Sequence, residues 1–271
     1  MAKVLVVTSG KGGVGKTTST AALGAALAQA GEKVVVIDFD VGLRNLDLML
    51  GAERRVVFDL INVIQGVAKL PQALIRDKRL DTLWLLPASQ TRDKDALTEE
   101  GVSQVIGELR EKFDWVICDS PAGIERGAIL AMRHADEAVI VSNPEVSSVR
   151  DSDRIIGMLD SKTVRAENGE RIKKHLLITR YDVARVARGE MLSIEDVLEI
   201  LSTPLLGIIP ESEDVLRASN VGSPVTLNNR LSVPAQAYIE AARRLKGEDL
   251  SISIPTAKAG LFGKWFGRRA A

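Results

Sequence analysis

Near the start of the chain, between an apolar run and a helical stretch, residues 10–17 read GKGGVGKT. This octapeptide matches the pattern G-x-x-x-x-G-K-[ST] in full, and it lies between a predicted strand (3–9) and a predicted helix (16–31), as a phosphate-binding loop requires. Its glycines let successive backbone N–H groups turn toward an anion, and the helix adds the positive end of its dipole. The complete motif in this position favours a nucleotide site over a glycine-rich turn without function.

The rest of the chain alternates short β-branched runs with longer helical patterns. We predict further strands over residues 33–40, 81–89, 113–121, 136–144, 174–182 and 203–210, and helices over 98–111, 124–135, 147–160, 193–201 and 231–246. Because the strand segments are continuously apolar instead of alternating, we expect parallel strands that are covered on both faces. The predicted fold class is therefore α/β, a mostly parallel sheet with helices on both faces in a three-layer sandwich.

Composition excludes several classes of protein. Lys plus Arg and Asp plus Glu both number 36, and zero net charge argues against coating nucleic acid by bulk charge. The single cysteine, Cys118, excludes a disulfide framework, and we expect it in the core. His134 and His175 are far apart, and we expect structural or surface roles. The chain shows no signal-peptide pattern and no apolar run of about 18 residues, so we expect a cytoplasmic body.

The phosphate loop predicts the ligands of a nucleotide and its metal ion. Lys16 would neutralise charge on the β- and γ-phosphates, and Thr17 would ligate Mg²⁺. The loop residues that we expect to bind the nucleotide are Gly10, Lys11, Gly12, Gly13, Val14, Gly15, Lys16, Thr17 and Thr18.

Carboxylates follow two of the predicted strands at their carboxyl ends. Asp38 and Asp40 end the second strand, and Asp119 ends the strand WVICD. We expect Asp38 and Asp119 to meet the metal ion or its water shell, and Asp40 to orient the attacking water. Gly123 would offer its backbone N–H to the γ-phosphate. One aspartate after a strand often only caps a helix, but two such strand ends downstream of a phosphate loop favour the metal site.

A second lysine, Lys11, directly follows the first glycine of the loop. The resulting pattern K-G-G-x-G-K-[ST] resembles that of the deviant Walker A ATPases, and the resemblance runs nearly from end to end. In that family the extra lysine reaches a phosphate of the nucleotide held by the partner subunit, which implies an ATP-dependent homodimer with Lys11, Lys16 and Asp40 as catalytic residues. Taken alone, Lys11 also fits a solvated loop lysine.

The sequence marks the nucleotide base less clearly than the phosphates. The segment TRYD (179–182) resembles the T-K-x-D base reader of related GTPases, but Arg180 stands where that motif has lysine. The family resemblance instead implies ATP, with Mg²⁺, as the cofactors. Arg180 and Pro210 are our candidates for flanking the base.

Three segments narrow the resemblance: GLRNLDL, ASQTRDKDALT and PEVSSVRDSDR. They are similar to segments in the members of the family that place the bacterial division septum. That similarity implies recruitment of a division inhibitor, MinC, and stimulated hydrolysis by MinE or an equivalent activator. Glu145 and Asp153, read as exposed acids, are candidates for the partner face, and a solvated helix surface is the open alternative.

Rival functions on the same fold need features that this chain lacks. A DNA-partition ATPase would need a basic patch, so no specific nucleic acid is expected as a partner. A nitrogenase-type reductase needs cluster cysteines, and a tyrosine kinase needs a tyrosine-rich tail. A structural role, in which ATP builds a membrane-bound copolymer and hydrolysis is incidental, stays open.

The last residues are apolar and basic together. On a helix, Leu261, Phe262, Trp265 and Phe266 would fall within an arc of about 140°, bordered by Lys264 and Arg268. This pattern is typical of an interfacial helix on an anionic membrane, and glycines would keep it unfolded in water. We therefore divide the chain into an ATPase domain (1–246), a flexible linker (247–257) and an amphipathic membrane-targeting helix (258–271).

Two tails on one dimer would bind one surface with an avidity gain of about 10²–10⁴. Attachment would then follow dimerisation, and dimerisation would follow ATP, so we expect reversible peripheral binding to the inner face of the plasma membrane. The alternative is that the tail packs in a groove of its own domain.

Overall fold

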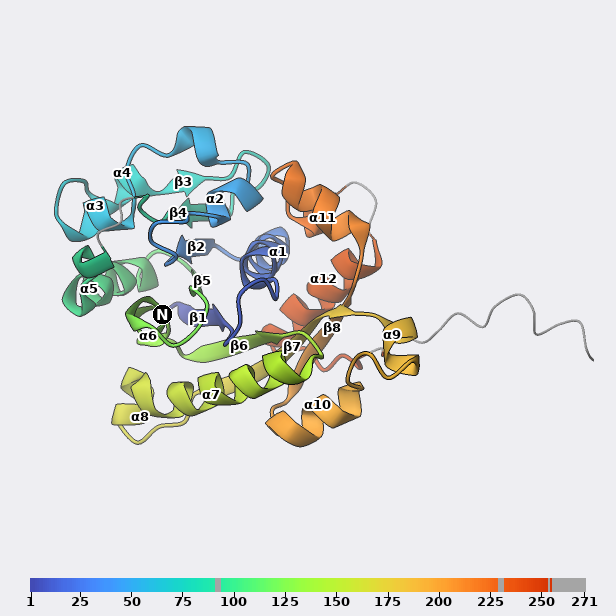
Figure 1. Cartoon of the computed structure of the whole chain (residues 1–271). Helices are drawn as coiled ribbons and strands as arrows, with labels where there is room; N and C mark the ends of the chain where they lie inside the picture. The colour runs from blue at the N-terminus through green and yellow to red at the C-terminus, as the bar shows by residue number, and fades with distance from the viewer. Residues whose placement is uncertain (91–93, 229–231, 253, 255–271) are drawn as a thin grey trace, which may run out of the picture.

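The computed structural model describes residues 1–90, 94–228, 232–252 and 254 (Figure 1). Its sheet has the strand order β3-β4-β2-β5-β1-β6-β7-β8, and within it only the β3–β4 pair is antiparallel. The strands are β1 (Lys3–Thr8), β2 (Val34–Asp38), β3 (Ile75–Arg76), β4 (Leu83–Leu86), β5 (Trp115–Asp119), β6 (Glu137–Ser142), β7 (Lys173–Tyr181) and β8 (Leu205–Pro210).

Helices cover both faces of this sheet. The α-helices are α1 (Lys16–Gln29), α2 (Leu46–Met49), α3 (Leu60–Ile64), α4 (Leu70–Ala73), α5 (Glu99–Arg110), α6 (Arg126–Met132), α7 (Val146–Lys162), α8 (Val164–Glu167), α9 (Val183–Ala187), α10 (Ile194–Leu201), α11 (Glu213–Asn220) and α12 (Val233–Leu245). Short 3-10 helices are η1 (Glu53–Arg55), η2 (Lys94–Ala96) and η3 (Val225–Leu227).

Two apolar cores lie on the two sides of the sheet. In β1, Val4 and Val6 face the core formed with α3 to α7 and α10, whereas Leu5 and Val7 face the core formed with α1, α2, α11 and α12. Figure 1 shows these helix groups on opposite sides of the strands. Every residue of β2, β5 and β6 is buried, as expected for strands covered on both faces. The predicted three-layer α/β fold is confirmed.

All seven strands predicted from the sequence are present, and each predicted helix matches an observed one, although its ends differ by up to three residues. Strand β3, helix α11 and the helices of four or five residues were not predicted. Two residues of strand, or one turn of helix, are too short to show a hydrophobic period. Within the described residues, no helix is long and apolar enough to cross a membrane.

The amino ends of β1, β6 and β7 share a buried ionic cluster. Glu137 accepts from Lys3 at 2.9 Å, and its other oxygen lies 2.8 Å from His175 Nε2. Burial raises the pKa of Glu137, but hydrogen bonds from His175 and Lys3 outweigh it and lower that pKa to about 2. His175 is thus structural, as predicted, and Cys118 is buried in β5, where desolvation raises its pKa to about 12.

Replacing Glu137 with glutamine is expected to lower the free energy of unfolding by about 2 kcal/mol at pH 7, because Lys3 and His175 lose a charged acceptor in a buried setting. The folded-state pKa of Glu137 lies below its ordinary value, so its stabilisation is present above pH 4.5 and is lost as pH falls toward 2. Urea titrations should therefore show that Glu137→Gln lowers the free energy of unfolding less at pH 3 than at pH 7. Glu108→Gln, in an exposed pair with Lys112, is the control and should change little at either pH.

Candidate active site

The strand order brings three predicted site segments to one edge of the sheet. Strand β1 lies between β5 and β6, and β5 lies between β1 and β2. The strands run parallel, so the loop after β1 and the carboxyl ends of β2 and β5 meet where the direction of chain winding reverses. In open α/β sheets, this is the point at which ligands bind.

The phosphate loop arches over the amine of its own lysine. Lys16 is buried, and its Nζ donates to Ser9 Oγ at 2.9 Å and to the Lys11 carbonyl oxygen at 3.4 Å. Burial lowers the pKa of Lys16, and the charges of Asp119 and Asp40 oppose that shift. Gly13 (φ 75°) and Gly15 (φ 97°) occupy the left-handed region, which other residues rarely adopt. The conformation of the loop therefore depends on its glycines, and the loop backbone covers the amine of Lys16.

Helix α7 supports the loop from the side. A Cβ placed on Gly10 would lie 2.3 Å from the backbone oxygen of Asp151, so only glycine fits at this position. A second contact comes from β7, where the Thr179 hydroxyl donates to the Val14 carbonyl oxygen at 2.6 Å. The position of the loop is thus fixed by its packing against α7 and β7.

Two buried carboxylates lie beside the loop as direct neighbours in the sheet. Asp38 pairs with Asp119 in the β2–β5 register. Burial, and next the charge of Asp119, raise the pKa of Asp38 to about 8; burial likewise raises the pKa of Asp119 to about 6. A divalent cation would remove this repulsion, and Mg²⁺ typically uses one or two carboxylates together with water and phosphate oxygens. The donor set fits Mg²⁺, although among the described residues no group of three or more His, Cys, Asp or Glu is arranged so that it could hold a metal ion by itself.

Helix α1 contributes hydroxyls to the same place. Thr20 donates to Asp119 Oδ1 at 2.9 Å, and the Thr17 hydroxyl lies close enough to Asp119 to lower the pKa of that carboxyl. Thr17 therefore lies where a ligand of Asp119-bound Mg²⁺ is required. Sequence reasoning missed three supporting residues, Ser9, Thr20 and Thr179, although the run KTTST, with its four hydroxyls after the loop lysine, pointed to Thr20.

Asp38 also organises the chain that follows β2. Its carboxylate accepts from the backbone N–H groups of Asp40 at 2.8 Å, and of Asn45 and Leu46 at 3.1 Å each. Helix α2 therefore begins on the carboxylate that we assign to the metal shell.

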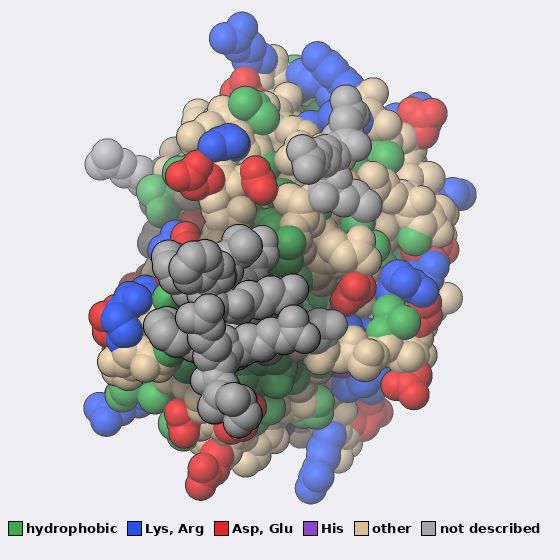
Figure 2. Space-filling model, turned by 90° about the vertical axis from the view of Figure 1, so that its right-hand side faces the viewer, with side chains coloured by type: hydrophobic (Ala, Val, Ile, Leu, Met, Phe, Trp, Pro, Cys, Tyr) green, Lys and Arg blue, Asp and Glu red, His purple; other side chains and the backbone are tan. Residues whose placement is uncertain are grey.

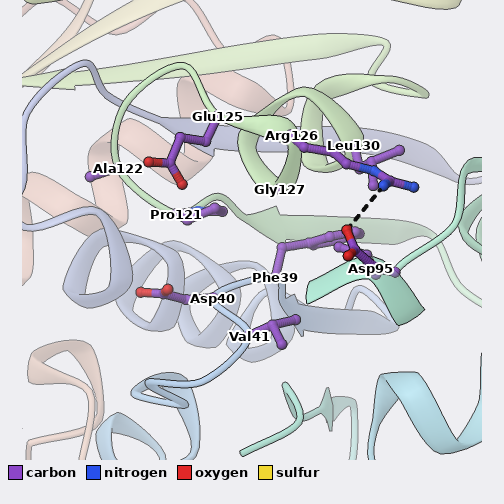
Figure 3. Close-up of a pocket in the computed structure, with 11 residues that line it drawn as sticks. Phe39, Asp40, Val41, Asp95, Pro121, Ala122, Glu125, Arg126, Gly127 and Leu130 are labelled. Atoms are coloured by element: carbon purple, nitrogen blue, oxygen red, sulfur yellow. Dashed lines mark hydrogen bonds and ion pairs between the residues drawn. The ribbon is translucent and has the colours of Figure 1, made fainter. Parts of the chain in front are cut away.

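Asp40 lines a cavity of about 400 Å³ that lies next to the two strand ends (Figure 3). Apolar side chains and the loop after β5 form its wall, and Arg126 pairs with Asp95 at 3.4 Å across it. The cavity leaves room for water near Asp40, as the predicted role requires. The other lining residues are Phe39, Val41, Leu97, Pro121, Ala122, Glu125, Gly127 and Leu130.

Lys11 lies at the surface of the site and is held within its own chain. Its Nζ lies 3.2 Å from Glu145 Oε2 and 3.0 Å from Ser147 Oγ, both at the start of α7. Glu145 was predicted as an exposed acid; its side chain is 38% exposed and is paired with Lys11. Asp153 is exposed on α7, as predicted.

Gly123 adopts φ 87° beside the loop, but its N–H donates to the Ser9 carbonyl oxygen at 3.2 Å.

The two base-flanking candidates, Arg180 and Pro210, line one cavity of about 430 Å³ that opens beside the loop. Gly15 and Thr18 line the end of this cavity that adjoins the phosphate loop. Arg180 adopts φ 54°, a strained value for a residue other than glycine. The remaining walls of this cavity come from the phosphate loop, α2, β7, the end of β8, α11 and α12, through Val14, Met49, Thr179, Ile209, Glu211, Ser212, Val215, Leu216, Ser219, Asn220 and Tyr238.

A phosphate loop, two strand-end carboxylates and a base-sized cavity on one mostly parallel sheet define an Mg²⁺-dependent P-loop nucleoside triphosphatase. A family profile, the CobQ/CobB/MinD/ParA nucleotide binding domain, matches residues 5–225. The septum site-determining protein MinD of Escherichia coli (strain K12) is 61% identical over 270 residues, which cover 98% of this chain and 100% of that protein.

Solved structures agree with the sequence comparison. MinD in the MinC:MinD cell division protein complex of Aquifex aeolicus is 43% identical, with a TM-score of 0.84 over 94% of this chain and 100% of that one. MinD complexed with Mg-ADP from Pyrococcus horikoshii OT3 is 31% identical, with a TM-score of 0.79 over 90% and 96%. The chain belongs to the CobQ/CobB/MinD/ParA family and, within it, to the MinD ATPases. It hydrolyses ATP and uses Mg²⁺.

Proposed function

We propose that this chain is a membrane-cycling ATPase of bacterial division-site placement. ATP closes a homodimer, the paired tails attach it to the inner membrane, and the bound form recruits MinC. Hydrolysis, stimulated by MinE or an equivalent activator, releases it. The observation that carries the proposal is the second lysine, Lys11, at the open edge of a complete phosphate site.

The residue roles follow from this geometry. Lys16 and the loop from Gly10 to Thr18 hold the phosphates, Thr17, Asp38 and Asp119 hold Mg²⁺ and its water, and Asp40 orients the attacking water. Arg180 and Pro210 flank the base. Mg²⁺, when bound, neutralises phosphate charge and orients the phosphates; the residues of this chain position the nucleotide, exclude bulk water and accept hydrogen bonds from the nucleophile.

The surface around the site supports closure against a second copy. Leu43 is 67% exposed, Ile124 is 56% exposed and Val146 is 64% exposed. All three lie on segments that carry site residues: Ile124 and Val146 directly follow Gly123 and Glu145, and Leu43 follows Asp40 by three residues. A group of large exposed apolar side chains around one site is typical of an interface. Closure would bury them and move Lys11 from Glu145 to the nucleotide of the partner.

The partner face is proposed on α7. MinC forms a complex with MinD in Aquifex aeolicus. Asp153 is exposed on this helix, and the carboxylate of Glu145 at its start would lose its partner when Lys11 leaves it. Recruitment of MinC would therefore depend on the same change that dimerisation produces.

The membrane-binding residues Leu261, Phe262, Lys264, Trp265, Phe266 and Arg268 lie outside the described residues, and their support is the sequence pattern. The chain leading to them stays on the domain up to Ile252, because Arg244 donates to the carbonyl oxygens of Leu250 at 2.8 Å and Ser251 at 2.6 Å. A groove of about 300 Å³ lies here, between β8 and α12. Figure 2 shows this side of the molecule, with basic and acidic side chains intermixed around hydrophobic ones. The alternative is a tail that docks on its own domain, and this groove would then be its binding site.

Sedimentation with anionic liposomes tests the proposal. The full chain should pellet with ATP or a slowly hydrolysed analogue and stay in the supernatant with ADP, whereas a chain that ends after Thr256 should not pellet with any nucleotide. Trp265→Glu in the full chain should also abolish pelleting, because it places a charge in the apolar arc. Equal pelleting of the full and shortened chains, or pelleting that is independent of nucleotide, contradicts the proposal.

A further inference from the structure

Two short helices on the same face of the sheet meet through a pair of glycines. Gly51, just after α2, and Gly222, just after α11, both adopt left-handed backbone, with φ of 61° and 64°. A Cβ on Gly51 would lie 2.8 Å from the Gly222 carbonyl oxygen, and a Cβ on Gly222 would lie 2.8 Å from Gly51 Cα. The two backbones are thus in direct contact, and Figure 1 shows α2 and α11 side by side.

One arginine bonds both segments at this contact. Arg79 donates through Nη1 to the Gly222 carbonyl oxygen at 3.1 Å and through Nη2 to the Leu50 carbonyl oxygen at 2.9 Å. Asp77 holds the guanidinium in place, since it accepts from Nη2 at 2.7 Å and from Nε at 3.2 Å. The side chain of Asp77 is only 5% exposed, so this support is shielded from water.

Helix α11 has few other contacts to fix its position. Ala218 is its one fully buried residue, and Leu216 is 62% exposed. The helix nevertheless supplies Val215, Leu216, Ser219 and Asn220 to the 430 Å³ cavity that we assign to the nucleotide base, and α2 supplies Met49. The width of this cavity therefore depends on how the ends of α2 and α11 are held together.

We infer that Arg79 is a positioning residue for the nucleotide pocket: by joining the ends of α2 and α11 from outside the site, it sets the wall against which the base and ribose pack. The inference rests on the proposed nucleotide assignment of this cavity. Arg79 lines none of the cavities described above, so its effect must pass through Met49 and α11. The phosphate loop and Asp119 are held by separate contacts, on α7, β7 and α1. Asp38 bonds the amino end of α2, through Asn45 and Leu46, whereas Arg79 bonds the chain just after its carboxyl end.

Arg79→Ala tests the inference, with Arg76→Ala as its matched control. Arg76 lies on the same hairpin, and its guanidinium bonds Asp81 at 3.0 Å and stacks 5.8 Å from the Trp84 ring, away from α2 and α11. By calorimetry, the Kd for Mg-ATP should rise about tenfold in Arg79→Ala and stay within about twofold in Arg76→Ala. Basal kcat at saturating ATP should change less than about twofold in either variant, since the catalytic groups stay in place.

A second variant acts on the same contact with Arg79 intact. Gly222→Ala places a methyl group against Gly51 and should raise the Kd for Mg-ATP in the same way, again with little change in kcat. An unchanged Kd in both Arg79→Ala and Gly222→Ala, with normal thermal melts, overturns the inference. So does a fall in kcat at unchanged Kd. If the unmodified chain does not bind Mg-ATP, the nucleotide assignment itself is wrong. That result differs from one in which the chain binds Mg-ATP but the Arg79 contact has no effect on the Kd.

Discussion

Lys11→Ala is expected to abolish ATP-dependent dimerisation and to lower kcat about 10³-fold, the scale on which a cation donated in trans acts in phosphoryl transfer. Mg-ATP binding by the single chain should persist, because Lys16, Ser9 and the loop backbone form the cradle without the Lys11 side chain, which points to Glu145 and Ser147. Sedimentation equilibrium with a slowly hydrolysed ATP analogue measures the dimer, and phosphate release measures kcat.

Lys33→Ala is a suitable control for that experiment. Lys33 is exposed and precedes β2 at the opposite end of the sheet, so its removal changes the net charge equally without touching the site. If Lys11→Ala still dimerises with the analogue and hydrolyses ATP at the normal rate, Lys11 is a solvated loop lysine. It then gives no support to the ATP-dependent homodimer.

Asp40→Ala is expected to lower kcat by about 10²-fold or more, because a positioned acceptor for the attacking water contributes on that scale. Binding of Mg-ATP and formation of the dimer should be retained, since Asp38 and Asp119 hold the metal shell and Lys16 the phosphates. The variant should therefore stay on liposomes with ATP when the unmodified chain has been released. Single-turnover hydrolysis and the bound nucleotide, analysed by chromatography, measure these effects.

Asp95→Ala separates this role from a general change in the cavity. Asp95 lines the same cavity as Asp40, but its side chain is 93% exposed and it pairs with Arg126. The Asp95 variant should hydrolyse ATP at close to the normal rate. Loss of ATP binding in Asp40→Ala, or hydrolysis at the normal rate, would show that Asp40 does not orient the nucleophile.

The sequence predicted the fold and the phosphate end of the site well because both depend on local patterns. The continuously apolar runs that became β1, β2, β5 and β6 identify buried parallel strands, and GKGGVGKT identifies its own loop. The aspartates at strand ends were found because strand direction fixes where a carboxyl end lies.

What could not be predicted depends on contacts between distant residues. No local pattern places Arg79 against Leu50 and Gly222, or Lys11 against Glu145, which are 134 residues apart. Helix α11 was missed for a related reason: it has only eight residues and buries only Ala218, so few apolar residues mark it in the sequence. The cavity that we assign to the base, with α11 in its wall, was accordingly the least defined part of the predicted site.

The close approach of Gly10 to Asp151 has a mechanical consequence for α7. There is no space between the loop and the helix, so a ligand that displaces the amino half of α7 by even a fraction of an ångström must also displace the backbone that surrounds the phosphates. Asp151 lies two residues before Asp153, on the helix to which we assign the partner face. A protein that docks there would thus push directly on the nucleotide cradle, and it could alter the rate of hydrolysis without itself reaching the phosphate.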